Sequence, residues 1–271
     1  MKDSINPLIS VITPCWNSEA YIEKTINSVL GQKCSNVEYI VIDGGSEDAT
    51  LDVIKSYEDF IYFWTSEPDS GMYDAINKGM RHANGEILAY LNSDDFYYPG
   101  TLSFVTRYFQ ENPAVDLLYG DLNFVDMCGD VLFKQSYPTF HLPHFRSMRH
   151  AAIGQPAAFW RRSLWDAVGE FDTTLKMASD FDFLIRAGQI GRLVHVCKVL
   201  SAFRIHEGSM TQSQIEVSHA EVMEIHRRYL NSNDGWKNLF NRMFGNINFK
   251  GINFVNWPRR LLSKLSRVVS T

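Results

Sequence analysis

The sequence predicts an α/β fold with a mostly parallel sheet covered by helices on both faces. Short runs of β-branched and aromatic residues recur through the first hundred positions, and segments with the apolar spacing of helices lie between them. Strands and helices that alternate in this way build a parallel sheet. With 271 residues, 45% of them hydrophobic, the chain is long enough to bury one large core.

The individual elements follow in chain order. Residues 8–13, LISVIT, form a short apolar run, and Ile22, Ile26, Val29 and Leu30 then recur at the spacing of an amphipathic helix. The unit repeats in EYIVID (38–43) with GSEDATLDVIKSY (45–57), and in FIYFWTS (60–66) with MYDAINKGMRHA (72–83), before a fourth strand, EILAYL (86–91). In the second half, residues 155–172 suggest a strand, a helix and a turn, and residues 179–191 suggest a further helix.

The net charge of −5 is unevenly distributed. Residues 232–271 carry +6, which leaves −11 for residues 1–231. We therefore expect a globular domain over 1–231 and a basic, helical C-terminal extension over 232–271. The extension mixes aromatic and aliphatic residues with Lys and Arg, a composition typical of segments that lie on anionic membrane surfaces. Packing of the extension against protein is the alternative. The acidic body argues against nucleic-acid binding.

The cellular location follows from what the sequence lacks. No apolar run approaches the roughly 20 residues of a membrane span, and the N-terminus has no signal-peptide pattern. Four scattered cysteines without a CxxC pair suggest neither a zinc site nor a disulfide framework. The protein is therefore expected to be cytoplasmic, with a peripheral association at the inner face of the membrane through its extension.

Ligands of open α/β sheets bind at the carboxyl ends of the strands. The loops there read TPCWNSE, DGGSEDAT, SEPDSG and NSDDFYYPG. None contains GxGxxG or a P-loop, which argues against a nicotinamide-dependent oxidoreductase. A bound phosphate would need a cation in place of a glycine cradle.

Adjacent carboxylates at Asp94 and Asp95 suggest where that cation binds. Two like charges this close are unfavourable unless something positive compensates them. Mg²⁺ or Mn²⁺ held by one of them, with water and ligand phosphate oxygens, would do so. The alternative is that one of them caps the following helix, with Pro99 near its first turn.

Six segments in order resemble the family 2 glycosyltransferases, which have the GT-A type of nucleotide-sugar-binding fold. They are ISVITPCWNSEAYIEKTINSVLGQ, EYIVIDGGSEDAT, EPDSGMYDAINKGM, NGEILAYLNSDD, ASDFDFLIRAG and RIHEGSMT. The resemblance spans about residues 8–212. It implies a nucleotide-sugar-binding half over 8–120 and an acceptor-binding half with the catalytic base over 121–231.

The resemblance also implies which residues hold the nucleotide sugar. The turn that includes Thr13 and Pro14 is expected to hold the nucleoside, with Trp16 stacked on the base and Asp43 accepting from a base N–H. Asp69 is a further expected contact with the nucleotide or the sugar. Core packing of Trp16, and turn-stabilising roles for Asp43 and Asp69, are the alternatives.

The family pattern places Asp94 near the ribose and makes Asp95 the ligand of Mn²⁺ or Mg²⁺. His206 resembles an additional ligand that some members use, although a surface or capping histidine is the alternative. Asn92 stands where some relatives carry another acid.

Asp180 matches the acid that serves as the catalytic base, with Ser179 in place of the usual Glu beside it. A sugar hydroxyl needs a carboxylate to take its proton as the new bond forms. A single displacement of this kind inverts the anomeric centre. A helix N-cap is the alternative role for Asp180.

The expected function is metal-dependent, inverting transfer of a hexose from a nucleoside-diphosphate sugar, with UDP favoured and GDP second. The expected acceptor is a hydroxyl of a glycan or a lipid-linked acceptor, in bacterial surface polysaccharide synthesis. A catalytically silent nucleotide-sugar-binding module is the alternative.

Overall fold

The computed structural model describes residues 8–229, except 33, 35, 143–152, 207 and 211–213. Within these residues, nine strands form one sheet in the order β3-β2-β1-β4-β8-β6-β9-β5, with β7 paired to β6. The predicted extension over 232–271 and the domain boundary before it lie outside the described residues.

The first half of the sheet consists of parallel strands, as the sequence predicts. The strands are β1 (Ile9–Cys15), β2 (Val37–Asp43), β3 (Phe63–Ser66) and β4 (Ile87–Tyr90). Their connecting helices are α1 (Ile22–Leu30), α2 (Thr50–Ser56), the short 3₁₀ turn η1 (Glu58–Phe60) and α3 (Met72–His82). The strands β1 and β2, β2 and β3, and β1 and β4 pair in parallel, so the α/β prediction is confirmed.

The second half makes the sheet mixed. Its strands are β5 (Phe96–Tyr97), β6 (Leu117–Val125), β7 (Val131–Gln135), β8 (Ala158–Arg161) and β9 (Leu193–Arg204), with the 3₁₀ turn η2 (Gln155–Ala157) before β8. Strand β8 joins β4 to β6 and is antiparallel to both. Strand β9 runs parallel to β6 and antiparallel to β5, which brings the end of β9 beside the loop that follows β4.

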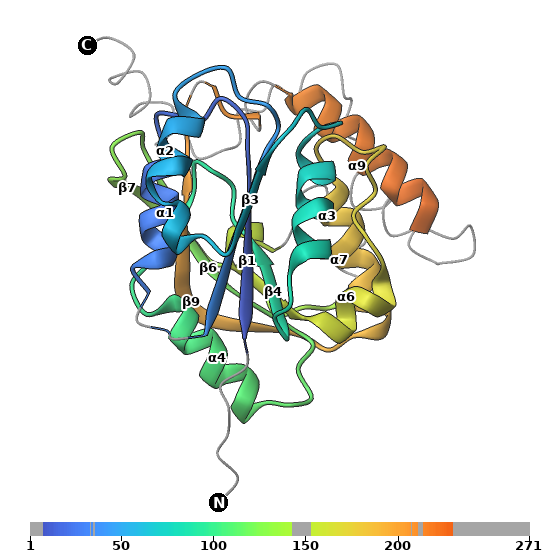
Figure 1. Cartoon of the computed structure of the whole chain (residues 1–271). Helices are drawn as coiled ribbons and strands as arrows, with labels where there is room; N and C mark the ends of the chain where they lie inside the picture. Colours follow the sequence, from blue (N-terminus) through green and yellow to red (C-terminus); the bar gives the residue numbers. More distant parts are fainter. Residues whose placement is uncertain are drawn as a thin grey trace, which may run out of the picture. The chain divides into compact units, whose positions relative to one another are not determined.

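Helices cover both faces of the sheet (Figure 1). Helices α1 and α2 lie on one side of the parallel strands and α3 and α7 on the other. The remaining helices are α4 (Thr101–Glu111), α6 (Arg162–Val168), α7 (Ser179–Ile190) and α9 (Ile215–Tyr229). Alternate residues of one strand enter different cores: Ile40 and Ile42 pack with α3, whereas Tyr39 and Val41 pack with α1. Both faces of the strands are buried, as their continuous apolar sequences predict.

The start of α4 tests the alternative that Asp94 or Asp95 caps the helix that follows them. Its N-cap is Gly100, with a φ of 80° and no side-chain cap, and strand β5 separates it from Asp94 and Asp95. Neither carboxylate caps this helix, so that alternative is wrong.

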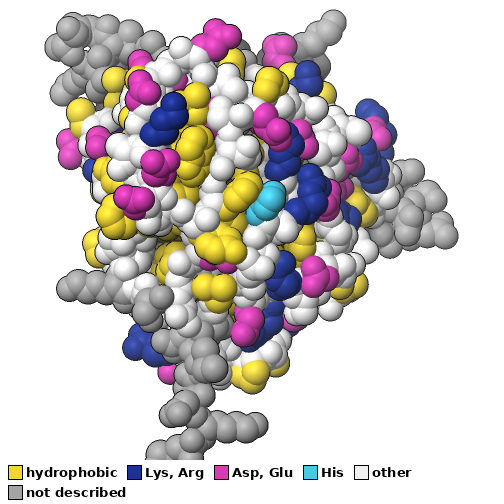
Figure 2. Space-filling model, viewed as in Figure 1, with side chains coloured by type: hydrophobic (Ala, Val, Ile, Leu, Met, Phe, Trp, Pro, Cys, Tyr) yellow, Lys and Arg dark blue, Asp and Glu magenta, His cyan; other side chains and the backbone are white. Residues whose placement is uncertain are grey.

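The face that carries the edge strand β3 shows acidic and basic side chains interspersed with apolar ones (Figure 2). Two of the exposed apolar side chains just before β3 are Phe60 and Tyr62. Among the described residues, no helix combines the length and apolarity needed to cross a membrane.

Candidate active site

The loops that follow the parallel strands meet at one edge of the sheet. Strand pairing sets Cys15 beside Asp43, and Asp43 beside Ser66. The loop after β4 is tied to the same edge, because Ser18 Oγ and Ser93 Oγ lie 2.8 Å apart. The expected gathering of these loops at the carboxyl ends of the strands is therefore present.

In the turn after β1, only Trp16 among the predicted contacts is open to solvent. Thr13 and Pro14 are buried within β1, and Thr13 Oγ1 accepts a hydrogen bond from Tyr39 OH at 3.0 Å. Both side chains are buried at the end of the strand, and the predicted contact of this turn with the nucleoside stays a prediction. Trp16 is 66% exposed, so the core-packing alternative is wrong for it and its ring is free to stack on a base.

Asp43 is fully buried and holds the turn after β2. Its Oδ2 accepts hydrogen bonds from the backbone N–H groups of Gly45 at 3.0 Å and Ser46 at 2.9 Å, and from Ser66 Oγ at 2.7 Å. Its Oδ1 accepts from Ser46 Oγ and lies 3.6 Å from Cys15 Sγ. These hydrogen bonds show that Asp43 stabilises the turn after β2. Its predicted contact with a base N–H stays a prediction.

Asp69 is one of the accessible acids of this region. It lies in the loop between β3 and α3 and is half-buried. Its Oδ1 accepts a hydrogen bond from the backbone N–H of Gly71 at 2.8 Å, and its carboxylate lies against Gly44. Its predicted contact with the nucleotide stays a prediction.

Asp94 and His206 form a pair although 112 positions separate them. His206 Nε2 lies 3.0 Å from Asp94 Oδ2. The side chain of Asp94 is 26% exposed and that of His206 is 11% exposed, so both border solvent. The structure therefore brings the predicted ligand His206 to Asp94 and not to Asp95.

Asp95 faces the protein interior and is only 1% exposed. Its Oδ1 accepts a hydrogen bond from the backbone N–H of Arg204 at 3.0 Å, and its Oδ2 has no partner within the described residues. Burial and the neighbouring Asp94 charge raise the pKa of Asp95 well above its usual range. The Arg204 guanidinium donates to the backbone carbonyls of Asp94, Asp126 and Met127, which fixes this turn. The structure thus pairs His206 with Asp94, while the predicted roles of Asp95 as the metal ligand and of Asp94 near the ribose stay predictions.

A metal would be held by few protein atoms here. Within the described part of the chain, no group of three or more His, Cys, Asp or Glu side chains is placed to hold a metal ion. Asp94 and His206 together offer a carboxylate oxygen and an imidazole nitrogen, which suit Mn²⁺. Mg²⁺ and Mn²⁺ commonly take one or two protein ligands and complete their shell with water and phosphate oxygens. The pair thus fits a metal that binds together with a diphosphate.

Asp180 lies in the first turn of α7 and faces Tyr73 of α3. Its Oδ1 accepts hydrogen bonds from Tyr73 OH at 3.2 Å and from the Phe181 backbone N–H at 2.8 Å. Within the described residues, no donor reaches its Oδ2. Burial raises the pKa of Asp180 to about 6, although the bonds from Phe181 and Tyr73 act in the opposite direction.

Helix α9 fixes the loop before Asp180. The Glu221 carboxylate accepts three backbone N–H groups, from Lys176 at 2.7 Å, Met177 at 2.8 Å and Ala178 at 3.0 Å. Ser179, which stands where the family usually has Glu, is fully buried. Tyr73 and Glu221 thus support Asp180 from α3 and α9, in place of the neighbouring Glu that the chain lacks.

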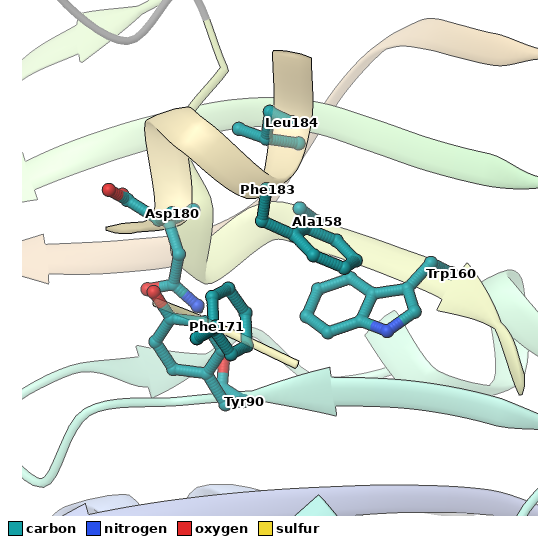
Figure 3. A pocket seen from close by; sticks show the side chains of 8 residues that line it. Tyr90, Ala158, Trp160, Phe171, Asp180, Phe183 and Leu184 are labelled. Atoms are coloured by element: carbon teal, nitrogen blue, oxygen red, sulfur yellow. The ribbon is translucent and has the colours of Figure 1, made fainter. Parts of the chain in front are cut away.

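A small pocket lies beside Asp180 (Figure 3). Its lining residues are Tyr90, Gln155, Ala158, Trp160, Phe171, Asp180, Phe183 and Leu184. The carboxylate of Asp180 lies on the opposite side of the pocket from Trp160. Burial raises the pKa of Tyr90 well above its usual range, with smaller contributions from the charges of Asp180 and Asp95. Tyr90 is the last residue of β4 and lines the same pocket as Asp180.

Three functional residues escaped sequence reasoning. Arg204 begins the motif RIHEGSMT and Tyr73 lies within EPDSGMYDAINKGM, so both lie in segments that the resemblance singles out. Glu221 lies in a helix without a recognisable motif. Its contacts with residues 176–178 span more than 40 positions, and no local pattern signals them.

Comparison with known proteins decides the family. Residues 10–159 match the family model described as Glycosyl transferase family 2. The chain belongs to this family. It is 30% identical over 198 residues to a PGL/p-HBAD biosynthesis glycosyltransferase of Mycobacterium bovis (strain BCG / Pasteur 1173P2), a match that covers 70% of this chain and 75% of that one. The chain is therefore a glycosyltransferase.

Solved structures share the fold. S. aureus TarS 1–349 in complex with UDP-GlcNAc has a TM-score of 0.64 at 23% identity, covering 83% of this chain and 72% of that chain. This chain spans 44% of a longer TarS structure. The mannosyltransferase PcManGT of Pyrobaculum calidifontis, in complex with GDP-Man and Mn²⁺, has a TM-score of 0.63 at 17% identity, covering 89% and 70% of the two chains. These likenesses identify the glycosyltransferase fold as the GT-A type.

Proposed function

We propose that this glycosyltransferase moves a sugar from a nucleoside-diphosphate sugar, with UDP favoured, to a hydroxyl of a glycan or a lipid-linked acceptor, with inversion. The observation that carries the proposal is the half-buried Asp180 carboxylate, which lines a pocket and has one oxygen free of hydrogen-bond donors among the described residues. The TarS and PcManGT complexes with nucleotide sugars on the same fold support it.

The chemistry follows from the atoms of Asp180. Tyr73 OH and the Phe181 N–H hold Oδ1, which leaves Oδ2 to accept the proton of the acceptor hydroxyl. The hydroxyl oxygen then bonds to the anomeric carbon as the bond to the diphosphate breaks. One displacement from the face opposite the leaving group inverts the anomeric centre.

We propose that the leaving diphosphate binds at the turn after β4. We assign Asp94 and His206 as the residues that would hold a divalent metal, Mn²⁺ or Mg²⁺, and Asp95 with Arg204 as the residues that fix the turn. When bound, the metal stabilises the negative charge that develops on the diphosphate. Trp16, at the same edge of the sheet, stacks on the nucleobase.

A thermal-shift panel with MnCl₂ tests the donor. A nucleoside diphosphate at 100 times its Kd adds about 2.7 kcal/mol to the stability of the folded state, a rise in Tm of about 5–10 °C for a domain of this size. UDP is expected to give the largest shift, GDP a smaller one, and ADP and CDP none. The absence of a shift with every nucleotide would contradict the proposal.

We further propose that residues 232–271 bring the enzyme to a membrane that carries its acceptor, in bacterial surface polysaccharide synthesis. The segment pairs its charge of +6 with aromatic and aliphatic residues, and each basic residue near an anionic surface adds about 1 kcal/mol of attraction. The full chain is expected to co-sediment with anionic vesicles, and this binding is expected to weaken as the salt concentration rises. A chain truncated after Asn231 is expected not to bind. Equal binding of both chains, or of neither, would rule the proposal out.

A further inference from the structure

The Glu221 side chain of α9 binds the backbone of the segment that leads into α7. Its Oε1 accepts the N–H of Lys176 at 2.7 Å, and its Oε2 accepts those of Met177 at 2.8 Å and Ala178 at 3.0 Å. Ala178 is the N-cap of α7 and has no side-chain cap of its own. Hydrogen bonds to a carboxylate are about twice as strong as neutral ones. Glu221 therefore fixes the backbone just before Asp180.

Helix α9 is packed against α7, so it can hold this segment in place. Val222 and Ile225 of α9 are buried in the same apolar core as Phe181 of α7. At the end of α9, Tyr229 OH donates a hydrogen bond to Asp182 Oδ1 at 2.8 Å. Glu221 is thus carried by a helix that is itself fixed to α7, which makes its position precise.

Tyr73 of α3 contacts the same segment. Its OH lies 3.2 Å from the Met177 carbonyl oxygen and 3.2 Å from Asp180 Oδ1. Burial raises the pKa of Tyr73 well above its usual range, and the charges of Asp180 and Glu221 add to this effect. The charge of Glu221 also acts on Asp180 itself. Glu221 therefore reaches Asp180 in two ways, through the backbone and through its charge.

We propose that Glu221 is a positioning residue for the catalytic base: it fixes the direction of the Asp180 carboxylate through residues 176–178 and places a negative charge near it. The inference rests on the proposed function, in which Asp180 takes the proton of the acceptor hydroxyl. The match to the family model ends at residue 159, so α9 lies outside the matched part of the chain.

The charge near Asp180 matters because a general base works best when its pKa lies near the operating pH. Among the described residues, titratable groups on three other elements act on this carboxyl: Tyr73 of α3, Tyr90 of β4 and Glu221 of α9. On α7 itself, Asp182 is bound by Arg186 and Tyr229. After burial, the charge of Glu221 raises the pKa of Asp180, whereas the bond from Tyr73 lowers it. Loss of the Glu221 charge should therefore lower this pKa and weaken the base.

A titration of the Asp180 carboxyl tests the charge without donor or acceptor. In the full chain labelled with ¹³C at the Asp carboxyl carbons, the Asp180 signal is identified by its loss in Asp180→Asn and is expected to titrate near pH 6. Glu221→Gln removes the charge and keeps an oxygen for Met177 and Ala178, so the midpoint is expected to move to lower pH. Glu216→Gln, the same change at an exposed position in the first turn of α9, is expected to leave it at about 6.

The positioning role also predicts that turnover and donor binding respond differently. Glu221→Ala removes the acceptor of the N–H groups of residues 176–178, and kcat is expected to fall about 10- to 100-fold because the base is misplaced. The KM for the donor is expected to stay within about threefold, because the proposed donor contacts lie elsewhere. Glu221→Gln is expected to lose less in kcat, with the acid limb of its pH profile moved to lower pH. Release of the nucleoside diphosphate, with the acceptor on which the wild type turns over, measures both.

The outcomes separate this inference from the proposed function. An unchanged midpoint and acid limb in folded Glu221→Gln, or normal kcat in folded Glu221→Ala, overturns the role of Glu221 and leaves the glycosyl transfer proposal standing. If Glu221→Ala does not fold, Glu221→Gln decides alone, because a merely structural glutamate would lower Tm without moving the midpoint. A wild type that releases no nucleoside diphosphate from any nucleotide sugar, while its titration still responds to Glu221, overturns the proposed function alone.

Discussion

Replacing Asp180 with Asn is expected to lower kcat by about 10²- to 10⁴-fold, the usual contribution of a positioned general base. An amide cannot take the proton of the acceptor hydroxyl. Asn is close to Asp in size, and its carbonyl oxygen can still accept from Tyr73 OH and the Phe181 N–H. The fold and the affinity for UDP are therefore expected to stay. Release of the nucleoside diphosphate, with the acceptor on which the wild type turns over, measures kcat.

The pH dependence gives a second readout of the same carboxyl group. Because burial raises the pKa of Asp180 to about 6, kcat of the wild type is expected to fall about tenfold per pH unit below pH 6, with a flat residual rate in the variant. A folded-state pKa above the ordinary 3.8 means that the ionised group destabilises the fold above pH 6. This cost disappears as the pH falls through about 4, so Asp180→Asn should not lower Tm at pH 7.5.

Asp166→Asn is the matched control, because Asp166 is an exposed acid on the neighbouring helix α6. It is expected to keep the wild-type rate and pH profile. Normal turnover in Asp180→Asn would place the base elsewhere. Loss of the folded state in this variant would show that Asp180 is needed for the fold; the N-cap of α7 is Ala178, so the helix-capping alternative does not apply.

The first half of the fold follows from local sequence. The strands β1 to β4 are short apolar runs separated by helical patterns, and β2 begins one residue before the predicted position and ends at it. Their parallel order needs no information beyond this alternation. Strand β9 is different, because its sequence LVHVCKVLSAFR mixes apolar with polar residues and is buried only at its first residue and near its end. Its pairing with β6 and β5 depends on contacts about 75 to 105 positions apart, which no local pattern contains.

In the candidate site, too, some features follow from local sequence and others depend on contacts between distant residues. The sequence places the acids at the ends of the strands, because loop position follows from strand position. It does not show which acid is buried. Asp43 accepts hydrogen bonds from a turn whose Gly45 has a φ of 83°, and the Asp69 carboxylate lies against Gly44, which has no side chain. Both outcomes depend on three-dimensional contacts between loops.

Which of Asp94 and Asp95 faces the interior is also not evident from local sequence. Adjacent residues on an irregular turn point in different directions, and the turn is fixed by Arg204 at the end of β9. The resemblance predicts that this pair belongs to the site, but the contact of Asp95 with Arg204, 109 positions later, is not signalled by any local pattern.

Asp94→Ala is expected to remove the dependence of donor binding and turnover on Mn²⁺ and to lower kcat/KM by about 10³-fold, equivalent to roughly 4 kcal/mol of lost charge stabilisation. The change deletes the carboxylate that lies 3.0 Å from His206 Nε2. His206→Ala is expected to raise the Mn²⁺ concentration needed for half-maximal activity by about tenfold or more, because one ligand remains. Asp59→Ala, which removes an exposed acid, serves as the control and should behave as the wild type.

Asp95→Asn distinguishes the proposed assignment, in which Asp94 holds the metal and Asp95 fixes the turn, from the assignment in which Asp95 holds the metal. Asn keeps an oxygen for the Arg204 N–H and removes a buried charge that has no partner for Oδ2 among the described residues. If Asp95 only fixes the turn, this variant keeps Mn²⁺-dependent UDP binding and the Mn²⁺ concentration for half-maximal activity, while Asp94→Asn loses both. Calorimetric titration of UDP with and without MnCl₂ measures the difference. A folded Asp95→Asn protein that no longer responds to Mn²⁺, beside an Asp94→Asn protein that still does, would return the metal to Asp95.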